Sequence, residues 1–566
     1  MAIVTARQSV VTFFQSRLSI GCRQRIVKMH QPPGVLPAGR NHRQRSLVVL
    51  KQPVNRLRRV LGVTVAVALA IGLAGCAGSD TPAAESDEGD NRSATFSLAV
   101  QSPPRSLDPV DLDAGQQAFV WSSLYDTLLY RDENGEIQPN AATDWEYSED
   151  GLTLTLTLRD DMTFSNGDPV DSEAVKATLD RNMERTGQQQ EKMQYVSSIE
   201  APDPQTVVIT FDAHDPAFLF NLTQDGGVIA HPETVDDERT TTNPIGSGPY
   251  TLNTDRTVNG STYVLERRDE YWNAEEYPFK TFTVKVLQDT TAAVNALRSG
   301  QVDVASVPAN QAASVEGNGI RTQFVPSISE AFINLADRDG TKVPALGDVR
   351  VRQAINYAMP REEMVEQLLS GAGEPTEQIF SKKGSAYLEE LEGTYEYDPD
   401  KARELLADAG YADGFSLSMP SSPVSLNFEP TITQALGDVG IDVVWDAVPA
   451  GSANAAVTTG EYAAYFATSA SAPPERESTR QLQSAAQNPF NWSDPELDAL
   501  IQAANAELDQ DARAERYQDI NRYVTENALF APLFYLGTTL ALKDSIERVG
   551  DGTNNFSTIR LYTTAD

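Results

Sequence analysis

The chain contains few residues that could cross-link it or ligate a soft metal. Its 566 residues include 2 cysteines, Cys22 and Cys76, and 4 histidines. A disulfide framework and a cysteine-rich zinc site are therefore excluded. His214 and His231, the two histidines after residue 75, are neither four residues apart nor near a cysteine. They favour structural roles over zinc binding or histidine-based catalysis, so we expect no metal site and no cofactor.

Acidic residues are absent from the first 75 residues, which hold twelve lysines and arginines. All 80 acidic residues follow, so the rest of the chain is more acidic than the formal net charge of −35 for the whole. Nucleic acid and anionic lipid surfaces would repel such a protein, and we expect neither as a partner. The simplest interpretation of this acidity is that it keeps an exported protein soluble.

The sequence before Cys76 has the form of a bacterial export signal. Basic residues within 56–59 precede a charge-free apolar run at 60–73, and the small residues Ala74 and Gly75 lead directly to the cysteine. The run is shorter than the ~20 residues that a transmembrane helix needs. A signal peptide is therefore favoured, with Cys76 as the lipidated first residue of the mature protein. The alternative is a chance cysteine at the end of a buried apolar segment.

Residues 1–75 are longer than a signal peptide needs to be. The excess is either an unusually long basic region or an overextended reading frame, and the second interpretation is favoured. Residues 76–92 are small, polar and acidic, with nothing apolar enough to pack. We therefore predict a lipidated Cys76 followed by a flexible linker. The expected location is extracytoplasmic, anchored to the cell membrane by lipid on Cys76 alone.

Strand and helix patterns are mixed after residue 93. Residues 95–100 and 152–158 alternate between apolar and polar side chains, which predicts strands. Asp289 precedes an apolar helical pattern that Gly300 ends, and Asp398 with Pro399 opens a predicted helix at 400–409. This alternation of helix and strand indicates the α/β class.

Signatures of catalysis are missing from the same region. The string nearest to Gly-x-Ser-x-Gly, Gly246-Ser247-Gly248-Pro249, does not match it, and no phosphate-binding loop of the Walker type is present. We therefore expect no catalytic residues and interpret the chain as a binder rather than an enzyme. Because 80 acidic residues could always include a catalytic pair, a secreted carboxylate-dependent hydrolase stays open as the alternative.

Six strings occur in order from about Ser93 to the end of the chain, and together they resemble one family. They resemble motifs of the family 5 extracellular solute-binding proteins, the peptide and nickel type of bacterial ABC importers, in a lipoprotein form. Each string is weak alone, but the ordered set is specific. The strings are Ser106-Leu107-Asp108-Pro109, Asp144-Trp145 with 151–170, Gly246-Ser247-Gly248-Pro249-Tyr250, 348–354, Asp398-Pro399 and 491–498.

The resemblance implies an α/β fold of the two-lobed periplasmic-binding-protein type (class II, the large type with an extra subdomain), with mixed sheets and a hinge between the lobes. By analogy, the first lobe combines three separate segments, and a subdomain is inserted in it. Ligand would lie between the two lobes. The implied boundaries are 93–133, 247–327 and 527–566 for lobe I, 134–246 for the inserted subdomain and 328–526 for lobe II.

The implied function is that of a substrate-binding lipoprotein of an ABC import system. Such a protein would be a monomer that captures an oligopeptide or another small polar solute and delivers it to ABC permease subunits in the membrane. Besides the hydrolase, the other alternative is an anchored signalling or interaction module on the same fold.

The ligand contacts can be placed only by analogy. Peptide binders of the family carry an aspartate in an aromatic stretch of the second lobe, and the corresponding residues 462–471 contain no carboxylate. A peptide amino group anchored there is therefore disfavoured, whereas the hydroxyls of Thr468, Ser469 and Ser471 suit a neutral or polar ligand. Nickel held by imidazoles is disfavoured as well. The predicted ligand contacts are Trp121, Tyr125, Tyr465, Phe466, Thr468 and Ser469. For the first two the alternative is a place in the core, which is the more frequent role of aromatic residues spaced four apart.

Overall fold

The computed structural model describes residues 94–449, 453–484 and 486–565. The predicted signal peptide, the lipidation at Cys76 and the linker at 76–92 lie outside the described residues. The described chain alternates helices and strands, which confirms the α/β class. None of the helices in this part of the chain is long and apolar enough to cross a membrane.

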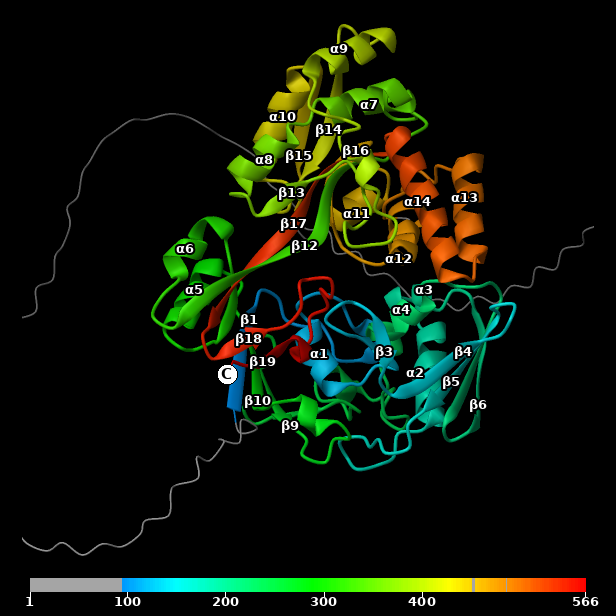
Figure 1. Ribbon diagram of the computed structural model, residues 1–566, viewed down its shortest axis with the longest axis vertical. Helices are drawn as coiled ribbons and strands as arrows, with labels where there is room; N and C mark the ends of the chain where they lie inside the picture. Colours follow the sequence, from blue (N-terminus) through cyan, green and yellow to red (C-terminus); the bar gives the residue numbers. More distant parts are fainter. Residues whose placement is uncertain (1–93, 450–452, 485, 566) are drawn as a thin grey trace, which may run out of the picture. The chain divides into compact units, whose positions relative to one another are not determined.

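A nine-stranded mixed sheet forms the centre of the fold (Figure 1). Its order is β16-β12-β17-β11-β1-β10-β9-β8, and β13 pairs with β17. β1 runs parallel to β10 and β11, while the other pairs are antiparallel. The strands are β1 (Ala94–Val100), β8 (Tyr250–Leu252), β9 (Thr262–Arg267), β10 (Phe279–Val286), β11 (Val304–Val307), β12 (Ile320–Leu335), β13 (Gly373–Pro375), β16 (Ala464–Ala470) and β17 (Phe530–Lys543).

The two long strands β12 and β17 pair along most of their length but bend in the middle. Their register shifts between Val325 and Ser329, and Ser327 between them adopts a positive φ of 52°. Gly537 lies opposite this bend, where an added Cβ would come within 2.8 Å of the Val325 carbonyl oxygen. One half of the strand pair borders β11 and the other half borders β16 and β13. The pair therefore joins two differently paired parts of one sheet through a bend that only small side chains fit.

A second sheet of four antiparallel strands has the order β4-β5-β7-β6 and packs against α2 (Ser172–Glu184). The predicted strand at 152–158 is confirmed as β5, in which Leu154 and Leu156 are fully buried. Asp171 caps α2 by accepting a hydrogen bond of 3.0 Å from the backbone N–H of Ala174. The strands are β4 (Ala142–Tyr147), β5 (Thr153–Leu158), β6 (Val196–Asp203) and β7 (Thr206–Phe211).

The helix starts predicted at Asp289 and Asp398 are confirmed, and Asp348 and Asp494 begin helices in the same way. Asp289, Asp348, Asp398 and Asp494 each accept a backbone N–H of the first turn, because a carboxylate satisfies donors that the helix leaves unpaired. The helix predicted at 400–409 is one residue earlier in the structure. These helices are α5 (Thr290–Arg298), α7 (Val349–Tyr357), α9 (Pro399–Asp408) and α13 (Pro495–Ala506).

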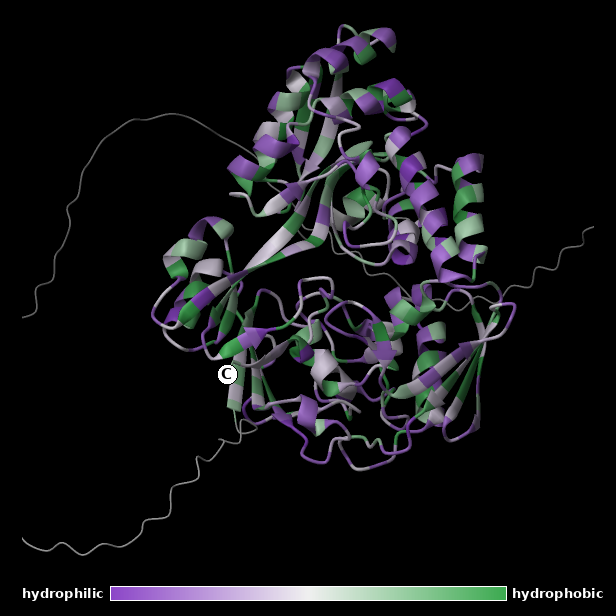
Figure 2. Ribbon diagram, in the orientation of Figure 1, coloured by the Kyte–Doolittle hydropathy of each residue, from purple (hydrophilic) through white to green (hydrophobic). Residues whose placement is uncertain are grey.

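The remaining helices and strands complete the hydrophobic cores. Figure 2 shows α13 and α14 with both apolar and polar residues, as expected for helices that bury one face. Leu497 and Ile501 of α13 meet Ile520 and Val524 of α14 in one of these cores. The remaining elements include α1 (Ala118–Leu124), β2 (Leu129–Arg131), β3 (Ile137–Pro139), α3 (Gln188–Lys192), α4 (Phe218–Leu222), α6 (Ala312–Val315), α8 (Arg361–Leu368), β14 (Phe415–Ser421), α10 (Glu429–Gly437), β15 (Ile441–Ala447), α11 (Ala453–Thr458), α12 (Pro474–Ser478), α14 (Gln510–Glu526), β18 (Ile546–Arg548) and β19 (Tyr562–Thr564).

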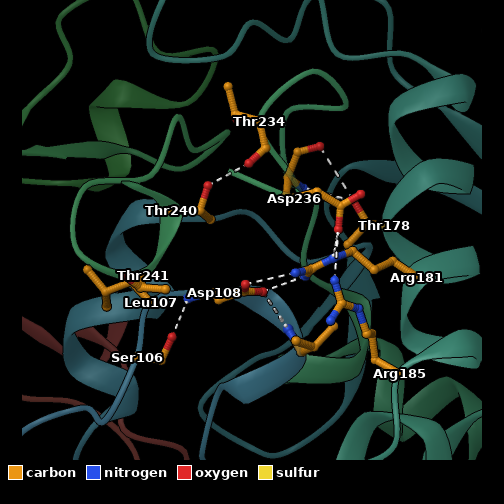
Figure 3. Close-up of polar contacts among 12 residues, drawn as sticks. Ser106, Leu107, Asp108, Thr178, Arg181, Arg185, Thr234, Asp236, Thr240 and Thr241 are labelled. Atoms are coloured by element: carbon orange, nitrogen blue, oxygen red, sulfur yellow. Dashed lines mark hydrogen bonds and ion pairs between the residues drawn. The ribbon is translucent and has the colours of Figure 1, made fainter. Parts of the chain in front are cut away.

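A buried ion pair ties the loop at 106–109 to α2 (Figure 3). The Arg181 guanidinium donates to both carboxylate oxygens of Asp108, with Nη1–Oδ1 at 2.5 Å and Nη2–Oδ2 at 2.8 Å. Its Nε donates to Asp236 at 2.8 Å. Asp108 belongs to one of the family-like strings, and the structure gives it a structural role in holding the loop.

Candidate functional site

A cavity of about 600 Å³ opens among loops that are distant in the sequence. One wall comes from the β2–β3 hairpin and the start of α4, and the other comes from the segments around residues 383 and 473 and the first turns of α14. Ser327, at the bend of β12, lies between these walls. The lining residues are Arg131, Asn134, Gly135, Glu136, Ile137, Trp145, Pro216, Leu219, Phe220, Ser327, Ser381, Lys383, Gly384, Ser385, Ser471, Ala472, Pro473, Pro474, Glu475, Gln510, Arg513, Ala514, Tyr517, Gly552 and Thr553.

Buried carboxylates support one wall of the cavity from behind. The Ser471 hydroxyl lies 2.6 Å from Glu330 Oε1, to which it donates. Glu477 accepts the backbone N–H groups of Ser381 and Ala472, both at 3.0 Å, and so holds two lining segments together. Burial raises the pKa of Glu330 to about 7, and burial together with the neighbouring Glu330 raises the pKa of Glu477. Glu330 and Glu477 are at most 1% exposed and do not line the cavity.

Two of the cations that line the cavity already have partners. The Lys383 ammonium lies 3.1 Å from an Asp551 carboxylate oxygen, and Arg513 donates through Nη1 to the Glu507 carbonyl oxygen at 3.1 Å. These contacts hold the two side chains at the edge of the cavity. A third cation, Arg131, has a different environment, which is described below.

Acidic and aromatic groups line the wall near α4 and α12. Burial raises the pKa of the Glu475 carboxyl, while the positive charge of Arg513 lowers it in part. Asp215, directly before the lining residue Pro216, has its pKa raised to about 6, also by burial. Aromatic surface comes from Trp145, Phe220 and Tyr517. The cavity therefore combines apolar area with a few polar groups, as ligand sites generally do.

The structure places the predicted contacts Trp121 and Tyr125 in a hydrophobic core. The indole Nε1 of Trp121 donates to the Asp113 carbonyl oxygen at 2.8 Å, and the Tyr125 hydroxyl donates to the Leu107 carbonyl oxygen at 2.8 Å. Neither side chain lines the 600 Å³ cavity. Tyr125 lines a much smaller cavity of about 30 Å³, next to Arg131 and Arg560.

The four predicted contacts on β16 also lie away from the cavity lining. Tyr465 is buried, and its hydroxyl donates to the Ala486 carbonyl oxygen at 2.6 Å. Phe466 stacks on Phe428, with ring centroids 5.0 Å apart. Thr468 is exposed and Ser469 is 6% exposed. Ligand contact by all six residues stays a prediction, and within this stretch it is Ser471 that reaches the cavity.

The sequence patterns did not single out Arg131, Phe220, Glu475 or Arg513 as site residues. A signal existed for Arg131, because residues two apart in a strand share a face. Leu129 and Arg131 are both buried on the same side of β2. The other three lie in the helices α4, α12 and α14, and their neighbours in space are distant in the sequence: Phe220 meets Arg131, and Glu475 is close enough to Asp215 and Arg513 to be affected by their charges. Across the described residues, no group of three or more His, Cys, Asp or Glu side chains is placed to hold a metal ion.

Comparison with solved structures places the fold in a class. Two solved structures with the same fold are DppA of Helicobacter pylori in complex with peptide STSA (TM-score 0.73, 21% identity, 84% of this chain and 98% of that one) and the A. tumefaciens protein AgaA in complex with agropinic acid (TM-score 0.71, 22% identity, 84% and 99%). NikZ of Campylobacter jejuni in complex with Ni(L-His) has a TM-score of 0.68 at 20% identity over 83% of this chain and 99% of that one. The fold is thus that of the two-lobed periplasmic binding proteins, as predicted.

Sequence similarity identifies the family within this class. Residues 136–490 match the bacterial extracellular solute-binding proteins, family 5 (middle region). The glutathione-binding protein GsiB of Salmonella paratyphi A is 30% identical over 370 residues, which cover 64% of this chain and 70% of that protein. GsiB of Escherichia coli O1:K1 matches over the same shares at 30% identity. The chain belongs to the family 5 solute-binding proteins of ABC importers, which confirms the resemblance found in the sequence motifs.

Proposed function

We propose that the chain is the substrate-binding lipoprotein of an ABC import system, which captures an oligopeptide or another small polar solute in the 600 Å³ cavity and delivers it to a membrane permease. The observation that carries this proposal is the cavity itself. Its volume lies within the roughly 300–1,000 Å³ range of small-molecule sites, and its lining comes from segments separated by hundreds of residues. The relatives named for binding glutathione and the structure with a bound peptide support a solute of this size.

The two walls of the cavity also contact each other through loops that do not line it. An added Cβ on Gly151 would lie 2.6 Å from Leu508 Cδ2 and 3.0 Å from His214 Nδ1, so the loop before α14 packs tightly on the loop before β5. This contact supports the proposal that two lobes close around the ligand by a hinge motion. The bend of β12 and β17 would serve as the hinge. The domain boundaries 93–133, 247–327 and 527–566 for lobe I, 134–246 for the subdomain and 328–526 for lobe II belong to this proposal.

We also propose that the protein has no catalytic step. A carboxylate-dependent hydrolase needs two carboxyl groups facing the substrate about 5–10 Å apart. Two neighbouring carboxylates, Glu330 and Glu477, are buried behind the cavity wall and accept hydrogen bonds from Ser471 and from backbone N–H groups. These contacts give Glu330 and Glu477 a structural role, so this pair does not supply the two carboxyl groups that a hydrolase would need.

A thermal-shift screen of the mature protein, purified from membranes in detergent, tests the proposal. The panel contains oligopeptides, glutathione, sugars and nickel–histidine complexes. A ligand that binds only the native state at 100 times its Kd stabilises that state by about 2.7 kcal/mol, so at least one solute should raise the Tm. A panel without any shift, combined with turnover of a substrate, would refute the proposal in favour of the hydrolase.

The anchor and the permease need their own tests. Cys76→Ser should release or misprocess the protein without abolishing ligand binding, since the cavity is lined by residues from Arg131 to Thr553. Fractionation of cells followed by a binding assay on both fractions measures this. Uptake of the bound solute should also stop when the partner permease is deleted; uptake that continues would favour the anchored signalling module.

A further inference from the structure

Arg131 is a buried cation that lines the cavity without an anionic partner. The residue ends β2 and is 9% exposed. Its Nη2 has no hydrogen-bond partner among the described residues. The guanidinium carbon lies 4.7 Å from the centroid of the Phe220 ring, and Phe220 also lines the cavity. Burial alone lowers the pKa of Arg131 to about 10, so the group remains charged at neutral pH.

Two other buried arginines, Arg181 and Arg361, donate their hydrogen bonds to acceptors within the protein. Arg181 binds both carboxylate oxygens of Asp108. Arg361 donates to the carbonyl oxygens of Pro532, Asn356 and Tyr395. Each of these groups serves the fold, because its charge and its donors are satisfied within it. Arg131 differs from them, and an unpaired buried charge is costly unless something else supplies the anion.

The backbone holds this arginine in place from two sides. Its strand pairs with β3, where Arg131 faces Ile137. The side-chain amide of Asn554 donates to the carbonyl oxygens of Arg131 and Asp132 at 2.8 and 2.9 Å. These contacts fix the main chain of Arg131 and use none of the donors of its guanidinium group. A preorganised donor of this kind suits a planar oxyanion, which a guanidinium can bind through two parallel hydrogen bonds.

We infer that the solute carries a carboxylate and that Arg131 binds this group in the cavity. The inference rests on the proposed function and narrows it, because it selects acids among the small polar solutes. Lys383 does not provide the same site, since Asp551 already neutralises its ammonium group. Arg513, the other guanidinium of the lining, already donates to the Glu507 carbonyl oxygen, whereas the Nη2 of Arg131 has no partner among the described residues.

Matched pairs of acids and amides test the inference with the full mature protein. The probes are glutathione, trialanine and Ser-Thr-Ser-Ala, each offered with its free C-terminal carboxylate and as the corresponding amide, and their Kd values are measured by calorimetry. For at least one probe the acid should bind the wild type roughly 10- to 100-fold more tightly than its amide, as expected for a charge-assisted hydrogen bond. The preference in the wild type tests the inference without any variant.

Three variants then assign the preference to a residue. Arg131→Gln should remove the preference for the acid: the Kd of the acid should rise roughly 10- to 100-fold while the Kd of the amide stays unchanged. Arg131→Lys should restore part of this preference. The control Arg350→Gln lies outside the cavity lining and should change the Kd of the acid by less than about 3-fold, because its ion pair with Asp348 is partly exposed and contributes little. The ligand-free Tm of Arg131→Gln should not fall below that of the wild type, since a purely structural arginine would lower it.

The outcomes separate this inference from the proposed function. Amides that bind as tightly as acids, or an acid preference that survives Arg131→Gln, would overturn the inference and leave a solute-binding protein for uncharged ligands. A panel in which neither acids nor amides bind, together with no shift in the wider thermal screen, would overturn the proposed function and the inference with it. Acid preference lost only in the Arg131 variants supports both.

Discussion

Replacing Asp108 by asparagine should leave the Arg181 guanidinium buried without its main counter-charge (Figure 3). The two side chains are only 10% and 9% exposed, and two short hydrogen bonds join them. An asparagine of the same shape keeps one acceptor oxygen but turns its NH₂ donors toward the guanidinium. The perturbation therefore removes the charge and half of the hydrogen bonding while it conserves the volume.

The cost can be bounded from the structure. Removing one partner of a buried ion pair typically destabilises a protein by 3–5 kcal/mol, so about 3 kcal/mol is expected here. The lower end applies because Arg181 keeps its 2.8 Å contact with Asp236, whose side chain is 70% exposed. Asp236→Asn, the matched control, should cost at most about 1 kcal/mol because that carboxylate is solvated.

Urea denaturation followed by tryptophan fluorescence measures both variants. The double variant Asp108→Asn/Arg181→Met should be more stable than Asp108→Asn alone, since the orphaned charge is then gone. A loss below about 1 kcal/mol for Asp108→Asn, or equal losses for Asp108→Asn and Asp236→Asn, would refute the reasoning from burial.

Two further predictions concern pH and backbone contacts. Burial raises the pKa of Asp215 from 3.8 to about 6 in the folded protein; its contribution to stability is therefore full below about pH 4 and is lost as the pH rises through 6, by about 3 kcal/mol. The Tm of Asp215→Asn should accordingly exceed that of the wild type at pH 8 and approach it at pH 4, and a difference that does not vary with pH would contradict this. Gly246→Ala should destabilise the protein by about 3 kcal/mol, because the new Cβ would lie 1.9 Å from the Leu124 carbonyl oxygen. Gly437→Ala is its control: nothing lies within 4 Å of the added Cβ, so this variant in α10 should be neutral or up to about 1 kcal/mol more stable, as urea denaturation would report.

Local chemistry made much of the fold predictable. The N-cap aspartates at 289, 348, 398 and 494 mark helix starts in the sequence because capping involves residues two or three positions apart. The leucine and threonine alternation of β5 is likewise readable, since one face of a strand is buried and the other is not. Sequence motifs in a fixed order were enough to indicate the family.

The cavity lining was not predictable in the same way. Aromatic and hydroxyl residues at 121, 125 and 465–469 resemble ligand contacts in composition, yet the structure packs Trp121, Tyr125, Tyr465 and Phe466 in its interior. Aromatic side chains serve cores and ligand sites through the same apolar area, so their type alone does not separate the two roles. Their exposure to the cavity depends on elements that pack against them from elsewhere in the chain.

The sequence by itself determined the class of the protein and many of its helix and strand starts, because these depend on residues close together in the chain; its export and anchoring stay predictions from the sequence. Only the tertiary structure decided which side chains form the site. Among the lysines and arginines that the structure describes, Arg131 is distinguished by what surrounds it: Phe220 beside it, Asn554 on its backbone and no hydrogen-bond partner on its Nη2. Electrostatic pairing depends on distances in space, and the partners of a buried charge can lie hundreds of residues away.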